Sequence, residues 1–294
     1  MIVLGIETSC DDTSLCLIKG DNSARPEVLS HTRFSQDTIL REWGGVVPEI
    51  AARNHLAKLS PLIKQTFEEA NLKVSDIDLI GVTTHPGLLG PLLTGLNAAK
   101  TLALLYKKPI VAVNHLFAHL EAVHLHEEIT YPYLGLVVSG GHTLFLLVSG
   151  PNEFEPLGST LDDAAGEAFD KGGKLLGLGY PAGVLIDQHA KLGNPKAINF
   201  PVGIRDSKNA NFSFSGLKTS MRTFIDKEGL PKDQRLNDVC ASYQDAIVRA
   251  IVLKSKYAKA FAKEKTGKEL RLVVGGGVAC NSGLRSGLVA KYKN

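Results

Sequence analysis

An internal repeat constrains the fold of this chain more than any other feature. The segment "LGIETSCDDTSLCLI" (residues 4–18) aligns with "LGLVVSGGHTLFLLV" (residues 134–148), 130 residues further on. Each copy consists of two runs of apolar β-formers joined by a short polar turn, which is typical of a β-hairpin. The identical pairs are Leu4/Leu134, Gly5/Gly135, Ser9/Ser139, Thr13/Thr143 and Leu17/Leu147. The repeat predicts two related domains, residues 1–130 and 131–294, each opening with a hairpin.

Strands and helices alternate after each hairpin. A helical pattern follows Pro48, a buried strand "DIDLIGV" precedes the helix "LLTGLNAAKTLALLY", and the long helix "SYQDAIVRAIVLKSKYAKAFAKEKTG" ends at Gly267. This order indicates an α/β fold with a largely parallel sheet in each domain. Two such domains with opening hairpins are similar to the duplicated actin-like and Hsp70-like ATPase (ASKHA) architecture, in which a nucleotide lies in the cleft between the domains.

Composition excludes several classes of protein. The 294 residues are 44% hydrophobic and 21% charged, which argues against a disordered chain or a coiled coil. Four cysteines without CxxC spacing cannot form a zinc ribbon and argue against a disulfide scaffold. No apolar run reaches the roughly 18–20 residues that cross a bilayer. We therefore expect a cytoplasmic protein that is neither secreted nor embedded in a membrane.

A histidine pair in "NHLFAHLEA" is the clearest candidate metal site. His115 and His119 are four residues apart, so on a helix both imidazoles lie on one face and can reach one ion. The alternative is two unrelated histidines, one at a helix cap and one packed. A metalloprotease would carry H-E-x-x-H, but Leu116 occupies the position of the general base.

Two glycine-rich turns are candidates for nucleotide binding. In "VVSGGHT" a strand enters Ser139, Gly140 and Gly141, and in "VVGGGVACN" a buried strand opens into three glycines before Asn281. Backbone N–H groups of such turns can approach phosphate oxygens closely, although a plain hairpin turn explains the first equally well. No G-x-x-x-x-G-K-[ST] motif occurs, which argues against a P-loop NTPase.

Two charged segments allow both a functional and a structural interpretation. Four carboxylates lie between residues 161 and 183, and basic residues gather between 249 and 271, with Lys218 and Arg222 in "FSFSGLKTSMR". Asp163, Glu167 and Asp170 have the spacing of one helix face, so they could hold a ribose or a cation, or simply be solvated. The basic residues could follow a phosphate backbone, or form an ordinary soluble helix.

Eight motifs together resemble one family over almost the whole chain. They occur in the order "GIETSCDDTS", "GGVVPEIAARNH", "PGLLGPLLTGLNAAKTLA", "NHLFAHLEA", "VVSGGHT", "GSTLDDAAGEAFDKGGKLLGLGYPAG", "FSFSGLKT" and "GGVACNSGLR". This combination is similar to the universal threonylcarbamoyltransferases, called TsaD in bacteria and formerly known as O-sialoglycoprotein endopeptidases. The resemblance implies transfer of a threonylcarbamoyl group from threonylcarbamoyl-AMP to N6 of adenosine 37 in tRNAs that read ANN codons (t6A formation).

The resemblance also assigns residues, a cofactor and partners. It implies that His115 and His119 hold one divalent ion, Fe²⁺ or alternatively Zn²⁺, and that both act in catalysis together with Ser139. The substrate-binding residues that it implies are Val137, Val138, Ser139, Gly140, Gly141, Asp170, Gly183, Asp187 and Asn281. Bacterial members work with a paralogous subunit of the TsaB type and a small ATPase of the TsaE type.

One feature departs from the family pattern. A third metal ligand, an aspartate, belongs to a "DN-x-x-M" segment that this sequence lacks, and the sequence ends at "VAKYKN". Either the sequence is shortened or the metal site is incomplete, so we expect weak metal retention and reduced activity. Two other functions stay open at this point: a metalloendopeptidase, and a nucleotide-binding actin-like regulator without transfer activity.

Overall fold

The computed structural model describes residues 1–21 and 25–292, and the chain forms two compact units, Met1–Ile129 and Thr130–Asn294. The division lies one residue from the domain boundary predicted from the repeat. None of the helices in the described ranges is long and apolar enough to cross a lipid bilayer.

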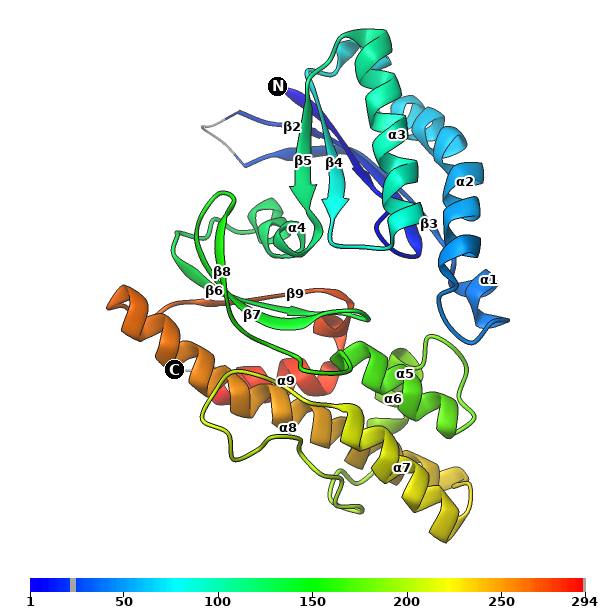
Figure 1. The fold of residues 1–294 in the computed structure, drawn as a ribbon, viewed down its shortest axis with the longest axis vertical. Coiled ribbons are helices and arrows are strands. Elements are labelled where there is room, and N and C mark those ends of the chain that lie inside the picture. The colour runs from blue at the N-terminus through cyan, green and yellow to red at the C-terminus, as the bar shows by residue number, and fades with distance from the viewer. Residues whose placement is uncertain (22–24, 293–294) are drawn as a thin grey trace. The chain divides into compact units, whose positions relative to one another are not determined.

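The first unit contains a five-stranded sheet in the order β3-β2-β1-β4-β5. Strand β1 pairs antiparallel with β2 and parallel with β4, and β4 pairs parallel with β5. Helices α2 and α3 lie beside one another along the sheet (Figure 1), and α2 begins at the predicted Pro48. The elements are β1 (Ile2–Glu7), β2 (Asp12–Lys19), β3 (Glu27–Ser35), α1 (Asp37–Arg41), α2 (Pro48–Glu69), η1 (Val74–Asp76), β4 (Leu79–His85), α3 (Leu89–Tyr106), β5 (Ile110–Asn114), α4 (His115–Glu121) and η2 (Ala122–Leu125).

The second unit contains a four-stranded sheet in the order β8-β7-β6-β9. Its long helix α8 packs against α6 and α9, as Figure 1 shows, and ends at Gly267, whose φ of 70° is left-handed. This helix begins at Asp233, earlier than its apolar pattern suggested. The elements are β6 (Tyr133–Val138), β7 (Thr143–Gly150), β8 (Glu153–Ser159), α5 (Ala165–Leu175), α6 (Gly183–Ala190), α7 (Ser215–Glu228), α8 (Asp233–Thr266), β9 (Leu272–Gly275), η3 (Gly277–Cys280) and α9 (Ser282–Tyr292).

The four strands of the second sheet repeat the order of four strands of the first, β3-β2-β1-β4. In both hairpins the aligned leucines are direct partners, since Leu4 pairs with Leu17 and Leu134 pairs with Leu147. A third antiparallel strand follows each hairpin, and a parallel strand adds to the other side. The opening hairpins predicted from the repeat are therefore confirmed.

Each sheet builds its own hydrophobic core. In the first unit the buried side chains of the strands, such as Leu4, Leu15 and Val82, pack with Leu59 and Leu62 of α2. In the second unit a larger core joins β6 and β7 to α5, α6, α7, α8 and α9. Burial of apolar surface on this scale stabilises each unit by about 25 cal/mol per Å² removed from water.

Candidate functional site

In the first unit, polar side chains meet where three parallel strands end. Strands β1, β4 and β5 run parallel, so their carboxyl ends share one edge of the sheet. Glu7 is the last residue of β1, Thr83 lies near the end of β4, and His115 follows β5. The Thr83 hydroxyl donates to Glu7 Oε2 over 2.6 Å, and His115 Nδ1 lies 3.1 Å from the same oxygen. The backbone N–H of Ser9 donates to Glu7 Oε1.

These contacts keep Glu7 ionised. Its burial raises the pKa of the carboxyl, but the hydrogen bond and electrostatic attraction of His115, with the hydrogen bonds from Ser9 and Thr83, outweigh that effect. The pKa of Glu7 is lowered to about 2. An ionised carboxylate accepts hydrogen bonds and cannot donate them.

The helix that carries the two histidines begins at a well-defined cap. Asn114 is the residue before α4, and its side-chain oxygen accepts from the backbone N–H of Leu116 and Phe117 over 2.9 and 3.1 Å. The cap places His115 at the first helical position, directly beyond the end of β5. His119 follows one turn later, and the two imidazole rings lie 4.5 Å apart between centroids at an interplanar angle of 73°.

This pair fits the donor set of a divalent metal ion only in part. Two imidazoles on one helical face are suitable first ligands for zinc or iron. Over residues 1–21 and 25–292, however, no group of three or more His, Cys, Asp or Glu side chains could hold an ion. The described residues therefore supply two ligands in this region, and the remaining positions would fall to other groups, such as water or substrate oxygens.

A buried histidine that we did not predict supports the turn between β1 and β2. His55 of α2 is fully buried; its Nε2 donates to the Cys10 carbonyl over 3.0 Å, and its Nδ1 lies 2.7 Å from the Thr13 hydroxyl. Burial lowers the pKa of His55, which favours the neutral ring. Its position one turn before the apolar Leu59 was the available signal.

In the second unit, the two predicted glycine turns lie next to each other. Strands β6 and β9 are parallel, and Val137 of β6 pairs with Gly275 of β9. The Ser139 turn and the triple-glycine turn therefore both start at the same edge of the sheet, where ligands of open α/β sheets bind. Gly276 has a φ of 98°, and a Cβ there would lie 2.4 Å from the Val138 carbonyl oxygen, so only glycine fits.

Two of the predicted substrate-binding residues are not in this turn. Val137 and Val138 end strand β6 and are fully buried, as expected of the strand that enters this turn, and their role in substrate binding stays a prediction. Their side chains cannot reach a ligand because they pack inside the unit. Gly140 and Gly141 are exposed, and a Cβ on either would meet nothing within 4 Å.

Ser139 is held by the backbone of the turn. Its N–H donates to the His142 carbonyl over 2.8 Å, and its hydroxyl accepts from the His142 N–H over 3.1 Å. The catalytic role predicted for Ser139 stays a prediction, because these contacts serve the turn.

The other predicted substrate residues connect three helices. Asp170 of α5 accepts from the Ala182 N–H over 2.8 Å, directly before Gly183, the first residue of α6. Asp187 of α6 accepts from the Ser282 hydroxyl over 2.6 Å.

Asn281 completes this network at the start of α9. Its side-chain oxygen accepts from the Leu284 N–H over 2.9 Å, and its amide donates to Gln244 of α8 over 2.7 Å. The structure thus brings Asp187 and Asn281 together through Ser282, and Asn281 caps α9. Gln244 was not among the predicted residues.

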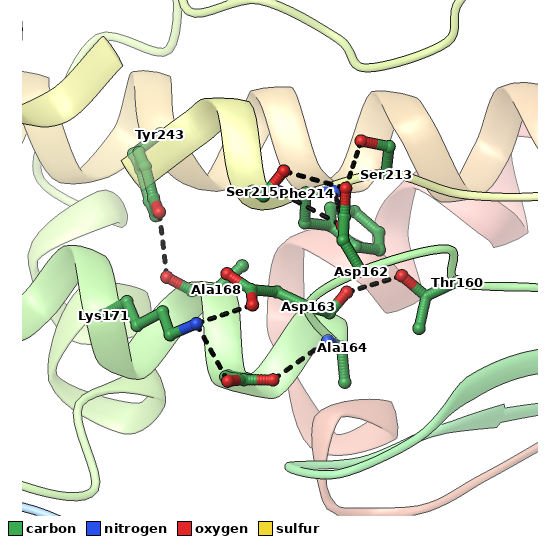
Figure 2. Close-up of polar contacts among 11 residues, drawn as sticks. Thr160, Asp162, Asp163, Ala164, Ala168, Lys171, Ser213, Phe214, Ser215 and Tyr243 are labelled. Carbon is green, nitrogen blue, oxygen red and sulfur yellow. Dashed lines mark hydrogen bonds and ion pairs between the residues drawn. The ribbon is translucent and has the colours of Figure 1, made fainter. Parts of the chain in front are cut away.

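Figure 2 shows that carboxylates of the acidic segment are engaged by other groups of the protein. Asp163 precedes α5, and Lys171 bridges it to Glu167, with Nζ–O distances of 2.5 and 2.9 Å. Asp162 instead accepts from the backbone N–H groups of Phe214 and Ser215 at the start of α7. Most of these carboxylates therefore stabilise the fold.

The basic residues singled out in the sequence do not all lie on the surface. Lys254 is buried, and its Nζ donates to the carbonyls of Ile204 and Ser207, each over 2.9 Å, so it does not belong to a surface patch. Arg249 pairs with Asp245 over 2.7 Å. Lys218 and Arg222 are exposed one turn apart on α7 and can still contact a ligand.

Known proteins match this chain over nearly its whole length. The family model for TsaD, tRNA N6-adenosine threonylcarbamoyltransferase, matches residues 27–294. The chain belongs to this family. The TsaD protein of Anaeromyxobacter sp. (strain Fw109-5) is 50% identical over 294 residues, which are 100% of this chain and 86% of that protein. The protein of the same name from Trichlorobacter lovleyi is 47% identical over 286 residues, which are 97% of this chain and 81% of that protein.

A solved structure shows the same fold outside the TsaD family. The activator of 2-hydroxyisocaproyl-CoA dehydratase from Clostridium difficile, with bound ADPNP, aligns over 100% of this chain and 87% of its own, with a TM-score of 0.56 and 13% identity. At this identity the likeness concerns the fold alone. The predicted actin-like ATPase fold class is confirmed, whereas the nucleotide cleft between the domains stays a prediction.

Proposed function

We propose that this chain transfers the threonylcarbamoyl group of threonylcarbamoyl-AMP to N6 of adenosine 37 in tRNAs that read ANN codons. Membership of the TsaD family over residues 27–294 carries the proposal. The adjacent glycine turns at the ends of β6 and β9 support it, because they lie at the edge of the sheet where ligands of open α/β sheets bind.

The transfer requires the protein to position the two substrates more than to activate the carbamoyl donor. Threonylcarbamoyl-AMP is a mixed anhydride, so AMP is already a good leaving group, and the protein must align the amine, exclude water and stabilise charge on the carbamoyl oxygen. Gly140 and Gly141 are exposed, and the backbone N–H groups of such a turn suit a phosphate. Asp170, Asp187 and Asn281 keep the neighbouring helix ends in place around that turn.

We further propose that His115 and His119 hold one divalent ion, Fe²⁺ or Zn²⁺. When bound, such an ion supplies Lewis acidity near the carbamoyl group. Two imidazoles are the ligands that the described residues offer in this region, and two protein ligands by themselves hold an ion weakly, so we expect weak retention. One tightly held equivalent of metal per chain, measured after dialysis, would contradict this expectation.

A variant pair tests the role of the histidines. The chain, tRNA and threonylcarbamoyl-AMP are incubated, and the tRNA is digested to nucleosides and analysed for t6A by mass spectrometry. We expect His115→Ala to abolish transfer and His31→Ala to leave it unchanged, because His31 is an exposed histidine of the same unit that contacts Ser14. Wild-type activity in His115→Ala would remove the histidine pair from the reaction.

Two surfaces suit the macromolecules that this function requires. Lys218 and Arg222 of α7 are exposed and can contact tRNA phosphates. The first unit exposes apolar side chains that are unusual on a free surface, among them Leu104 at 81% and Leu105 at 68% exposure on α3. We infer a protein partner of the paralogous TsaB type, together with a small TsaE-type ATPase, and we expect the protein to act in the cytoplasm.

The two rival functions have less support. The family model that matches the chain is a transferase, and Leu116 stands where a zinc peptidase of the H-E-x-x-H type carries its general base. A casein digest with a chelator control tests that activity. The t6A assay separates a transferase from an actin-like regulator that only binds nucleotide.

A further inference from the structure

Glu7 is a carboxylate outside the predicted site residues that contacts one of the two histidines. Its Oε2 atom lies 3.1 Å from His115 Nδ1 and accepts from the Thr83 hydroxyl over 2.6 Å. Its other oxygen accepts from the backbone N–H of Ser9. The carboxylate is therefore fixed from three directions, by strand β4, by the turn after β1 and by the start of α4.

This fixed carboxylate determines which nitrogen of His115 carries the proton. Because Glu7 is an acceptor, the hydrogen bond requires a proton on Nδ1 of His115. In the neutral ring the lone pair then belongs to Nε2, the nitrogen that is not facing Glu7. The Ser9 hydroxyl also lies 3.1 Å from Nδ1, so a second polar group contacts the same nitrogen.

We propose that Glu7 is a positioning residue that keeps His115 in the Nδ1–H tautomer and presents its Nε2 lone pair to the metal ion. The inference rests on the metal site of the proposed function and adds to it the residue that orients the first ligand. Carboxylate–histidine–metal arrangements of this kind fix the ring and raise its basicity as a ligand. His119, 4.5 Å away between ring centroids, would supply the second imidazole.

A purely structural role for Glu7 is the alternative. Its bonds to Thr83 and Ser9 could serve only to join β1 to β4 and to close the turn. In that case its replacement would lower stability without changing the tautomer of His115 or the affinity for metal. These two properties therefore discriminate between the roles.

The tautomer can be read in the metal-free protein. We measure the ¹⁵N resonances of the His115 ring in the whole chain at neutral pH, in the wild type, Glu7→Gln and Glu7→Leu. We expect the Nδ1–H tautomer in the wild type and a shift toward the Nε2–H tautomer in Glu7→Leu, which has no acceptor. An unchanged tautomer in folded Glu7→Leu would overturn the proposal.

Metal affinity supplies the second measurement. We titrate Zn²⁺, and separately Co²⁺, into each variant and expect affinity to fall about 10–100-fold in Glu7→Leu. Glu7→Gln keeps the shape and an acceptor but lacks the charge, so a smaller loss is expected. If Glu7→Leu does not fold, Glu7→Gln replaces it in the metal titration. A metal affinity of Glu7→Gln equal to that of the wild type would then overturn the proposal.

A matched control and the transfer assay separate this inference from the proposed function. Glu121→Gln removes another carboxylate of the same region, which lies 3.8 Å from His124, and should change neither tautomer nor affinity. If the wild type binds metal and forms t6A but the Glu7 variants bind equally well, only this inference fails. If the wild type forms t6A without binding any ion, the metal part of the proposed function and this inference both fail.

Discussion

The N–H of Gly166 donates a 3.1 Å hydrogen bond to the carbonyl oxygen of Ser139. This contact joins the first turn of α5 to the turn between β6 and β7, where the substrate phosphate is expected. A Cβ on Gly166 would lie 2.6 Å from the same oxygen and 2.7 Å from Gly140 Cα. The backbone of the turn can approach the helix this closely only because residue 166 has no side chain.

Replacing Gly166 should therefore damage the turn. Gly166→Ala places a methyl group against backbone atoms that cannot rotate away, so α5 and the Ser139 turn must move apart. We expect AMP binding, measured by calorimetry, to weaken at least about tenfold, a loss of about 1.4 kcal/mol. Gly216→Ala is the matched control, because that helical glycine has open space around its Cβ position. Equal affinity in both variants would show that the close approach is unimportant for binding.

The hydrogen bonds that the Asp162 carboxylate accepts make part of the free energy of unfolding dependent on pH. Burial raises the pKa of this carboxyl, but hydrogen bonds from Ser213, Phe214 and Ser215 outweigh it, so its folded-state pKa is lower than the ordinary 3.8. The stabilisation is complete above the unfolded-state pKa and is lost as pH falls through the folded-state pKa.

We therefore predict that Asp162→Asn flattens the stability profile in acid. Urea unfolding at pH 6 should show a loss of about 1–2 kcal/mol in the variant, because the neutral amide lacks the charge that strengthens the bonds from the start of α7. At pH 3 the difference from the wild type should shrink. A difference that stays constant between pH 6 and pH 3 would contradict the assignment.

Lys254 should matter to stability rather than to nucleic-acid binding. Only 1% of this residue is exposed, and its ammonium group donates to Ile204 and Ser207 in the segment before α7. Lys254→Met removes these charge-assisted bonds. We expect a loss of about 2–4 kcal/mol in denaturant unfolding.

The neighbouring Lys256 supplies the control for Lys254. It is exposed on the same helix, so Lys256→Met should change the free energy of unfolding by less than about 0.5 kcal/mol. Lys254→Met could instead prove as stable as Lys256→Met and lose affinity for tRNA. That result would contradict the prediction and show that Lys254 takes part in binding tRNA.

The repeat predicted the hairpins and the two units because the inward-facing residues of β1, β2, β6 and β7 are apolar and occupy equal positions in both copies. The third strand of each sheet escaped prediction. β3 reads "EVLSHTRFS" and has only two buried residues, Ser30 and Thr32, because it is an edge strand with few apolar side chains. Its pairing with β2 depends on backbone hydrogen bonds, which leave no pattern of hydrophobic residues.

The site was predictable where function requires a particular residue type, and less so where a partner residue lies far away in the sequence. The histidine spacing and the glycine turns were visible in the sequence. The pairing of Glu7 with His115 joins residues 108 positions apart, and that of Asn281 with Gln244 joins residues 37 apart. Such contacts follow from which strands are parallel and which helices pack together, so they required the tertiary structure.

The most direct test of the account is nucleoside analysis of unmodified tRNA after incubation with this chain and threonylcarbamoyl-AMP, with and without a paralogous subunit and a small ATPase. The account predicts t6A at position 37 of tRNAs that read ANN codons, dependent on both the chain and the activated donor. Absence of t6A under every one of these conditions, from protein that is folded and binds AMP, would contradict it.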